Sequence, residues 1–272
     1  MFTIKLTLPS GKTTRLGELN NRDYLVILKF CQNKDYVGLN DFFDKLYFTP
    51  DLNIFDRFYI LLFVRKLFVD NKLTFVGKNK IDVSYSIDNI LNKLVDNYTD
   101  IEETLVYDDI KLKVGIPHGL YFAGVDDLYQ YTIREIVYKE TSVNFTKLTS
   151  EEKNKILDRL PTQIFLLLQQ YISQLSNTLF DITLIEANKE FDIQEIKINI
   201  IGNGVLQFIT SIFSYDLVFF YEALYYYNHF VSKGSGDFFD LSFNEVRLML
   251  KIHSERIDKE NKELKRQERL LT

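Results

Sequence analysis

The sequence predicts an α+β protein that is predominantly helical. Short stretches in the first half alternate apolar and polar residues with a period of two, whereas helical periodicity dominates from about residue 125 onward. Hydrophobic residues make up 46% of the 272 residues and charged residues 26%, values typical of a folded globular chain with a sizeable core. We therefore expect N-terminal hairpins interleaved with helices, followed by a mostly helical C-terminal half that ends in a long charged helix.

The first element is predicted to be a β-hairpin. Ile4, Leu6 and Leu8 alternate with polar residues, and the Pro-Ser-Gly sequence that follows has the composition of a tight turn. The next residues, Gly-Lys-Thr, are also found at the end of phosphate-binding loops. That motif needs a glycine where this chain has Leu6, and Pro9 has no N–H to offer a phosphate. We interpret the stretch as a turn between two strands.

Three helices are expected after this hairpin. Asn20 or Asn21 caps the first, which runs to about Asn33. The second covers Leu39 to Tyr47, and the third, over residues 53–69, is the most apolar segment of the chain. The apolar face of the first helix consists of Tyr24, Ile27, Leu28 and Cys31. Cys31, the single cysteine, is therefore expected to be a core residue.

Three cations lie on one flank of the helix predicted over 53–69. We expect Arg57, Arg65 and Lys66 to form the solvated edge of a helix that is otherwise buried. A nucleic-acid binding patch built from the same side chains is the weakest functional alternative. Its weakness follows from the net charge of −5 and the pI near 5.4, since a general nucleic-acid binder carries a basic surface.

The remaining elements follow from the same two periodicities. In the first half they are strands 73–76 and 81–85, a helix from Ser86 or Asp88 to about Asp96, and strands 103–106 and 110–114. In the second half they are helices over 125–139, 150–160, 161–181 and 205–230, one or two strands within 182–201, and a last helix from about Ser242. We divide the chain into an α+β region over 1–120, a mostly helical region with a strand insert over 121–240, and a charged helix over 241–272.

Two segments of the C-terminal half are predicted to bind a partner. Leu250, Ile257, Leu264 and Leu271 recur every seven residues and form a narrow apolar stripe on a highly charged helix. The alternatives for this helix are a solvated helix and a docking helix. The tyrosine-rich sequence FFYEALYYYNHF suits core packing or a protein interface, because tyrosine is enriched at interfaces. Its predicted contact residues are Tyr225, Tyr226 and Tyr227.

The sequence provides no catalytic, cofactor or metal motif. His118, His229 and His253 are spaced too far apart for the known metal-binding pairs, and one cysteine cannot form a zinc cluster. The alternative to a binding protein is an enzyme whose site is assembled from distant acidic residues. The uncharged stretches 161–180 and 198–215 contain many Gln, Asn and Ser residues, so we expect them to be buried in protein rather than in a membrane.

Four stretches resemble one protein family when they are taken in order along the chain. They are LPSGKTTRLGELNNRDYLVILKFCQNKD, FDRFYILLFVRKLFV, LDRLPTQIFLLLQQYI and LSFNEVRLMLKIHSERIDKENKE. Together they are similar to the baseplate hub subunit, or hub assembly protein, of T-even-like phages with contractile tails, especially the marine relatives. This chain has additional sequence between about 70 and 125 compared with the compact members.

The resemblance implies a phage structural or assembly protein without enzymatic activity. Its implied partners are other tail or baseplate hub proteins, with the tape-measure protein as one candidate and self-association as another. It implies no cofactor and no metal, and it places the protein in the host cytoplasm during assembly and in the tail baseplate of the virion. The sequence adds no preference among the partners.

Overall fold

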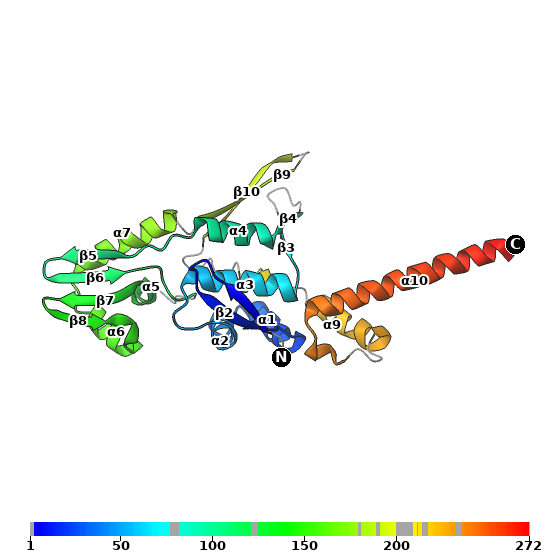
Figure 1. Ribbon diagram of the computed structural model, residues 1–272, viewed down its shortest axis with the longest axis horizontal. Helices are drawn as coiled ribbons and strands as arrows, with labels where there is room; N and C mark the ends of the chain where they lie inside the picture. Colours follow the sequence, from blue (N-terminus) through cyan, green and yellow to red (C-terminus); the bar gives the residue numbers. More distant parts are fainter. Residues whose placement is uncertain are drawn as a thin grey trace.

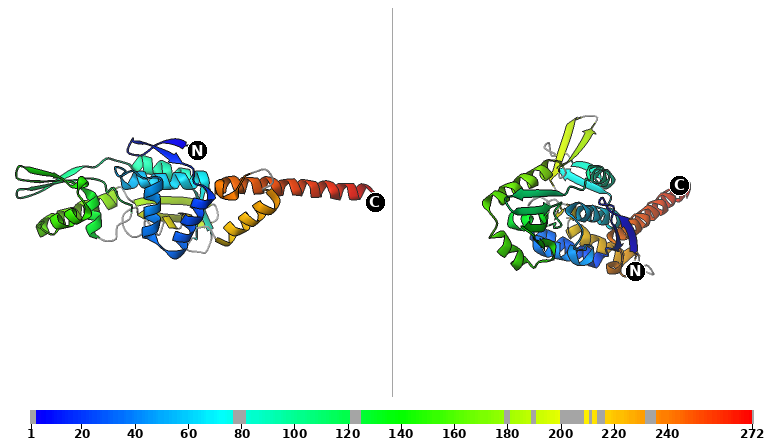
Figure 2. Two further views of the ribbon diagram at one scale, coloured as in Figure 1. Left: turned by 90° about the horizontal axis from the view of Figure 1, so that it is seen from below. Right: turned by 60° about the vertical axis from the view of Figure 1, so that its left-hand side comes forward.

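The computed structural model is an elongated α+β molecule in which helices predominate, as the sequence predicts (Figure 1). A four-stranded sheet lies at one end, helices α1 to α4 form the middle, and α9 and α10 lie at the other end. Figure 2 shows the same order along the long axis in two further views. The structure describes residues 3–76, 82–120, 125–178, 181–188, 191–199, 209–210, 212–213, 217–231 and 236–271.

The first two strands form the predicted hairpin. Strand β1 (Thr3–Thr7) pairs antiparallel with β2 (Thr13–Gly17). In the turn, Gly11 has a φ of +80°, a backbone conformation that favours glycine, and the Leu8 N–H donates to the Lys12 carbonyl at 2.8 Å. The Gly-Lys-Thr sequence is therefore part of a hairpin and does not open a helix.

Three helices build the middle of the molecule. They are α1 (Asn21–Asn33), α2 (Tyr36–Leu46) and α3 (Ile54–Phe68). The side chain of Asn20 accepts from the Asp23 N–H and caps α1, which confirms the predicted start, and Asn53 caps α3 in the same way. Since α3 is buried around most of its circumference, it forms the centre of the core.

The cations of α3 do not form the solvated edge that the sequence suggests. Arg57 and Arg65 are buried, with 7% and 5% of their surface exposed, whereas Lys66 is partly exposed and pairs with Asp88. Arg57 Nη1 lies 2.5 Å from Asp44, and its Nε donates to the Leu52 carbonyl at 3.0 Å. A buried guanidinium needs such partners, and neither arginine is available to bind a nucleic acid.

A second hairpin and a short helix cover the other side of α3. Strand β3 (Lys72–Val76) pairs with β4 (Asp82–Ser86), and α4 (Ile87–Asn97) follows directly. The predicted strands and helix are confirmed, while the turn over 77–81 lies outside the described residues. The apolar face of α4, which packs on α3, consists of Ile87, Ile90, Leu91 and Leu94.

The four-stranded sheet has the order β5-β6-β7-β8, with every neighbouring pair antiparallel. Its strands are β5 (Glu103–Tyr107), β6 (Ile110–Val114), β7 (Ile133–Tyr138) and β8 (Thr141–Asn144). Its helices are α5 (Val125–Thr132), α6 (Ser150–Leu157) and α7 (Thr162–Thr178), with the short η1 turn (Phe145–Lys147) after β8. Because β6 and β7 pair across residue 120, the sheet joins the predicted first and second regions, and the division at this residue stays a prediction.

The helix predicted over 125–139 is wrong in its second half. The helix ends at Thr132, and residues from Ile133 onward form β7. Three β-branched residues, Ile133, Ile136 and Val137, favour a strand, and β6 offers an edge with which they can pair. Tertiary pairing therefore outweighs the helical periodicity of this segment.

The last elements surround the C-terminal end of the body. The segment 182–201, predicted to contain one or two strands, contains two: β9 (Asp181–Asn188) and β10 (Phe191–Asn199) pair as an antiparallel hairpin that projects from the body (Figures 1 and 2). They are followed by α9 (Leu217–Tyr226), the π-helical turn η2 (Tyr227–Val231), the short turn η3 (Phe238–Asp240) and α10 (Phe243–Leu271).

Candidate functional site

Helix α9 and the η2 turn bury one face against the core. Phe220 and Tyr227 are fully buried, and the ring of Phe220 stacks on that of Phe243 with centroids 5.7 Å apart. Tyr227 also packs against Phe238 and donates its hydroxyl to the Gly236 carbonyl at 3.1 Å. These contacts fix the orientation of α9 and therefore determine which residues face outward.

The outward face of α9 and η2 is aromatic. Tyr225, Tyr226 and Phe230 have 54%, 50% and 55% of their surface exposed. Tyr226 stacks on Phe230 with centroids 6.0 Å apart, and Tyr225 stacks on His229 at 4.0 Å. The rings support one another while their outer surfaces remain in water, which costs free energy unless another molecule covers them.

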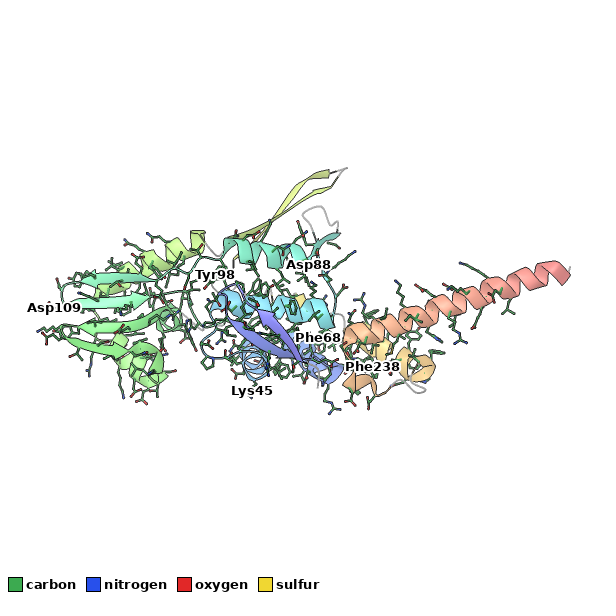
Figure 3. All side chains as sticks on the ribbon, viewed as in Figure 1. Lys45, Phe68, Asp88, Tyr98, Asp109 and Phe238 are labelled. Atoms are coloured by element: carbon green, nitrogen blue, oxygen red, sulfur yellow. The ribbon has the colours of Figure 1, made fainter. Side chains whose placement is uncertain are left out.

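The first turns of α10 are held firmly by the body. Asn244 donates to the Leu67 carbonyl at 3.2 Å, and Arg247 pairs with Asp70 at 2.9 Å. Burial raises the pKa of Asp70, but the hydrogen bond and the charge of Arg247 together lower it below its usual value, so this carboxylate is ionised. Phe68 and Phe238 lie beside this root of the helix (Figure 3).

One face of α10 passes from the core into solvent. Residues seven apart share a face of a helix, and Phe243, Leu250, Ile257 and Leu264 form such a series. Phe243 is 1% exposed and Leu250 is partly buried against the core, whereas Ile257 and Leu264 are 41% and 56% exposed. The face that anchors α10 therefore continues beyond the body, where the helix projects away from its neighbours (Figures 1 and 3).

The two exposed faces form one surface. His253 stacks on Phe230 with centroids 5.9 Å apart, and it lies one turn before Ile257 on α10. This histidine joins the aromatic residues of η2 to the apolar face of the helix. We call the combination of Tyr225, Tyr226, Phe230, Ile257 and Leu264 the α9–α10 surface.

The structure separates the seven predicted contact residues. Tyr225, Tyr226, Ile257 and Leu264 lie on the α9–α10 surface; Leu250 is partly buried, Tyr227 is buried, and the side chain of Leu271 lies outside the described residues. Sequence reasoning missed Phe230. The signal that could have identified it is its position four residues after Tyr226, which places both rings on one helical face.

The three histidines do not form a common site. His118 lies in the loop after β6, His229 in η2 and His253 on α10. Burial, followed by the charges of Arg134, Lys12 and Arg57, lowers the pKa of His118 to about 3, so it is neutral at physiological pH. Over the described parts of the chain, no group of three or more His, Cys, Asp or Glu side chains is arranged to hold a metal ion.

Two acidic residues between the first hairpin and the sheet, Asp51 and Glu135, form ion pairs with Lys12 and Lys113. The hydrogen bonds from Thr49 and Lys12 lower the pKa of Asp51, and the hydrogen bond from Lys113 lowers that of Glu135. A general acid needs a carboxyl group whose pKa is raised toward the working pH. Neither of these carboxylates has that property.

An exposed apolar surface of this kind is typical of proteins that work by binding other proteins. The family model described as T4 bacteriophage base plate protein matches residues 1–200. Because the match covers most of the chain, the protein belongs to this baseplate family. No curated protein and no solved structure matches the chain.

Membership of the baseplate family confirms the class of protein that the sequence resembles. It indicates a structural protein of the phage tail baseplate that contacts other tail proteins. Among the described residues, no helix has both the length and the apolar composition to cross a membrane. The α9–α10 surface lies after residue 200, outside the matched segment, whereas the sheet and helices α1 to α7 lie within it.

Proposed function

We propose that this protein is a non-enzymatic component of the baseplate hub, or a chaperone of hub assembly, and that its α9–α10 surface binds another tail protein. Contact with tail proteins follows from the family, while the hub role rests on the resemblance carried by the four sequence stretches. The proposal extends the family function by naming the surface that makes the contact.

The observation that carries this proposal is the continuation of one helical face from the core into solvent. Phe243 packs in the core of this molecule, and Ile257 and Leu264 repeat its position two and three heptads later. Fifteen residues of helix, from Ile257 to Leu271, extend about 20 Å. A partner that packs along this length would bury Ile257 and Leu264, just as the body of this protein buries Phe243 on the same face of the helix.

The charges around the stripe favour a protein partner over a nucleic acid. Lys251 pairs with Glu255, and Arg256 pairs with Glu260 at 2.8 Å, so positive and negative groups alternate along the exposed helix. A nucleic acid would be repelled by the acidic members of these pairs. Mixed charges beside a narrow apolar stripe are typical of helices that pack against another helix. We therefore infer that the partner presents an apolar helical face.

The proposal is tested by affinity purification of the tagged protein from phage-infected cells, followed by mass spectrometry. The test variant combines Tyr226→Ser, Phe230→Ser and Ile257→Ser, which remove exposed apolar groups and leave the core intact. The control combines Val106→Ser and Tyr138→Ser. The side chains of Val106 and Tyr138 are 55% and 53% exposed, but they lie on the sheet at the other end of the molecule.

We expect wild type and control to recover the same tail protein, and the test variant to recover at least tenfold less of it. Equal recovery by all three would contradict the proposed surface. Recovery of the tape-measure protein, or of an untagged copy of this chain, would identify which of the candidate partners the surface binds. Thermal melting of the purified variants checks that each is folded.

A further inference from the structure

A second, separate feature is a pocket of about 380 Å³ between the middle of the molecule and the sheet. Its walls come from α2 and the loop after it, from the loop after β6, and from α3, α5, β7, η1 and α6. The aromatic and apolar walls include Phe48, Pro50, Tyr131 and Ile133. Its charged groups are Asp44, Arg57, Arg134 and Lys153, so positive charge predominates in a chain whose net charge is −5.

The charge of Arg57 is already neutralised within the protein. Asp44, which is the single carboxylate among the described residues that line this pocket, pairs with it at 2.5 Å. The guanidinium also donates to the Leu52 carbonyl and lies 4.9 Å from the centre of the Phe48 ring. Arg57 therefore serves as a fixed part of the wall.

Arg134 and Lys153 differ from Arg57 in this respect. Arg134 donates to the carbonyl groups of Tyr131, at 2.8 Å, and Ile116, and Lys153 Nζ lies 5.7 Å from the centre of the Phe145 ring. Within the described part of the chain, neither cation has a carboxylate at ion-pair distance. Among the described residues the pocket thus contains two charges without a directly paired carboxylate, and only the more distant Glu102 and Asp100 act on Arg134.

The electrostatics of both groups point in the same direction. Burial lowers the pKa of Arg134 to about 10, and burial together with the charge of Arg134 lowers the pKa of Lys153. Each shift means that the protein environment disfavours the charged form. An anion between the two groups would stabilise both charges.

The surroundings indicate what kind of anion fits. A second cavity of about 530 Å³ shares His118, Arg134 and Thr146 with the pocket, so the two form one groove. The second cavity is lined by charges of both signs, namely Lys12, Asp51, Asp100, Glu102, Lys113 and Glu135. A nucleic acid carries a negative charge at every phosphate and would be repelled by the four carboxylates of the second cavity. A peptide with one acidic side chain can place that group in the pocket and neutral or basic residues beside the carboxylates.

We propose that this groove binds an acidic peptide segment of another protein, with one carboxylate seated between Arg134 and Lys153. Apolar neighbours of that acidic residue would contact Phe48, Tyr131 and Ile133. The site lies within the segment matched by the family model and is distinct from the α9–α10 surface. The test of this peptide-binding proposal is therefore independent of the test of the α9–α10 surface.

The test uses the purified full-length protein and three probes: the peptide acetyl-Leu-Glu-Leu-Asn-amide, its neutral counterpart acetyl-Leu-Gln-Leu-Asn-amide, and inorganic phosphate. Binding is measured by NMR chemical-shift perturbation. The test variant is Lys153→Gln, and the matched control is Lys155→Gln, because Lys155 lies on the same helix but pairs with Glu151 on the surface. Lys153→Arg keeps the charge.

We expect the acidic peptide to bind wild type, Lys155→Gln and Lys153→Arg, and to bind Lys153→Gln at least tenfold more weakly. The neutral peptide should not bind. Three results would overturn the proposal: no binding of the acidic peptide, equal binding by Lys153→Gln, or saturable binding of phosphate without binding of the acidic peptide. The last result would assign the pocket to a free phosphate group.

Discussion

The polar residues of the first hairpin turn bind other parts of this protein and are not arranged as in a phosphate-binding loop. Asp56, at the start of α3, accepts hydrogen bonds from the Ser10 N–H at 3.1 Å and from its hydroxyl at 2.8 Å. Lys12, which would contact phosphates in a nucleotide-binding loop, pairs with Asp51 at 3.0 Å. The polar groups of this stretch are therefore used to fasten the hairpin to the middle of the molecule.

Replacing Asp56 tests this attachment. We expect Asp56→Ala to lower the free energy of unfolding by about 1–3 kcal/mol, because both Ser10 donors lose their acceptor in a partly buried site. Asp56→Asn keeps one acceptor and the side-chain shape, so its loss should be smaller. Urea denaturation measures both values. An alanine variant as stable as wild type would contradict the role of Asp56.

His118 predicts a pH dependence of stability. Its pKa is about 3 in the folded protein and near 6.5 when unfolded, so between these values only the unfolded chain takes up the proton. The free energy of unfolding should therefore fall as the pH is lowered below 6.5, by up to about 1.4 kcal/mol per pH unit from this group.

The measurement compares urea denaturation of wild type and His118→Gln between pH 7 and pH 4. The groups that act on His118 are Arg134, Lys12, Arg57 and Asp51, and all remain in the variant. The variant lacks the titrating imidazole, so it should lose less stability on acidification than wild type. Parallel pH profiles would show that His118 does not cause the dependence.

At the scale of secondary structure, α3 organises the molecule. The helix is buried around most of its circumference, which is unusual for a helix of a globular domain, and α4, α10 and the first hairpin contact it. Arg57 and Lys66 of this helix are accordingly paired with Asp44 and Asp88. Changes in α3 should affect the entire body.

Two phenylalanines of α3 provide a comparison on the same helix. Phe58 is fully buried, whereas Phe63 is partly exposed. Phe58→Ala should lower the free energy of unfolding by about 3–5 kcal/mol through lost burial and a cavity. Phe63→Ala should cost clearly less. Thermal or urea unfolding measures both, and equal losses would be inconsistent with the central position of α3.

Local sequence patterns predict most of these elements and fail where distant partners decide. The helix cap at Asn20 and the seven-residue repeat that begins at Leu250 can both be recognised from residues that are close together in the sequence. Strand β7 depends on the edge of β6, and the burial of Arg57 depends on Asp44, so neither is encoded locally. The pocket with Arg134 and Lys153 was missed for the same reason, since its walls come from elements far apart in the sequence, from α2 to α6.

At the scale of the whole molecule, the family-matched body and the projecting helix have different roles in our account. The body holds the core, the sheet and the groove, whereas the outer part of α10 has no neighbour among the described elements (Figures 1 and 2). Every described side chain from Ser254 to Leu264 is exposed. Removal of this part should therefore leave the body unchanged.

A chain truncated before Glu255 separates folding from binding. We expect its free energy of unfolding to stay within about 0.5 kcal/mol of wild type, because only exposed described side chains are lost. Its recovery of tail proteins should fall at least tenfold. Circular dichroism during urea denaturation measures the first quantity and affinity purification the second. A truncated chain that binds its partner normally would exclude α10 as a docking element.

The central claim, that the α9–α10 surface touches another tail protein, is tested most directly by photocrosslinking in infected cells. The photoreactive residue p-benzoylphenylalanine replaces Phe230 on this surface or, as a control, Tyr138 at the far end of the sheet. Our account predicts that crosslinking from position 230, but not from position 138, attaches a baseplate or tail protein, which mass spectrometry identifies. The absence of any tail protein crosslinked to position 230 would contradict it.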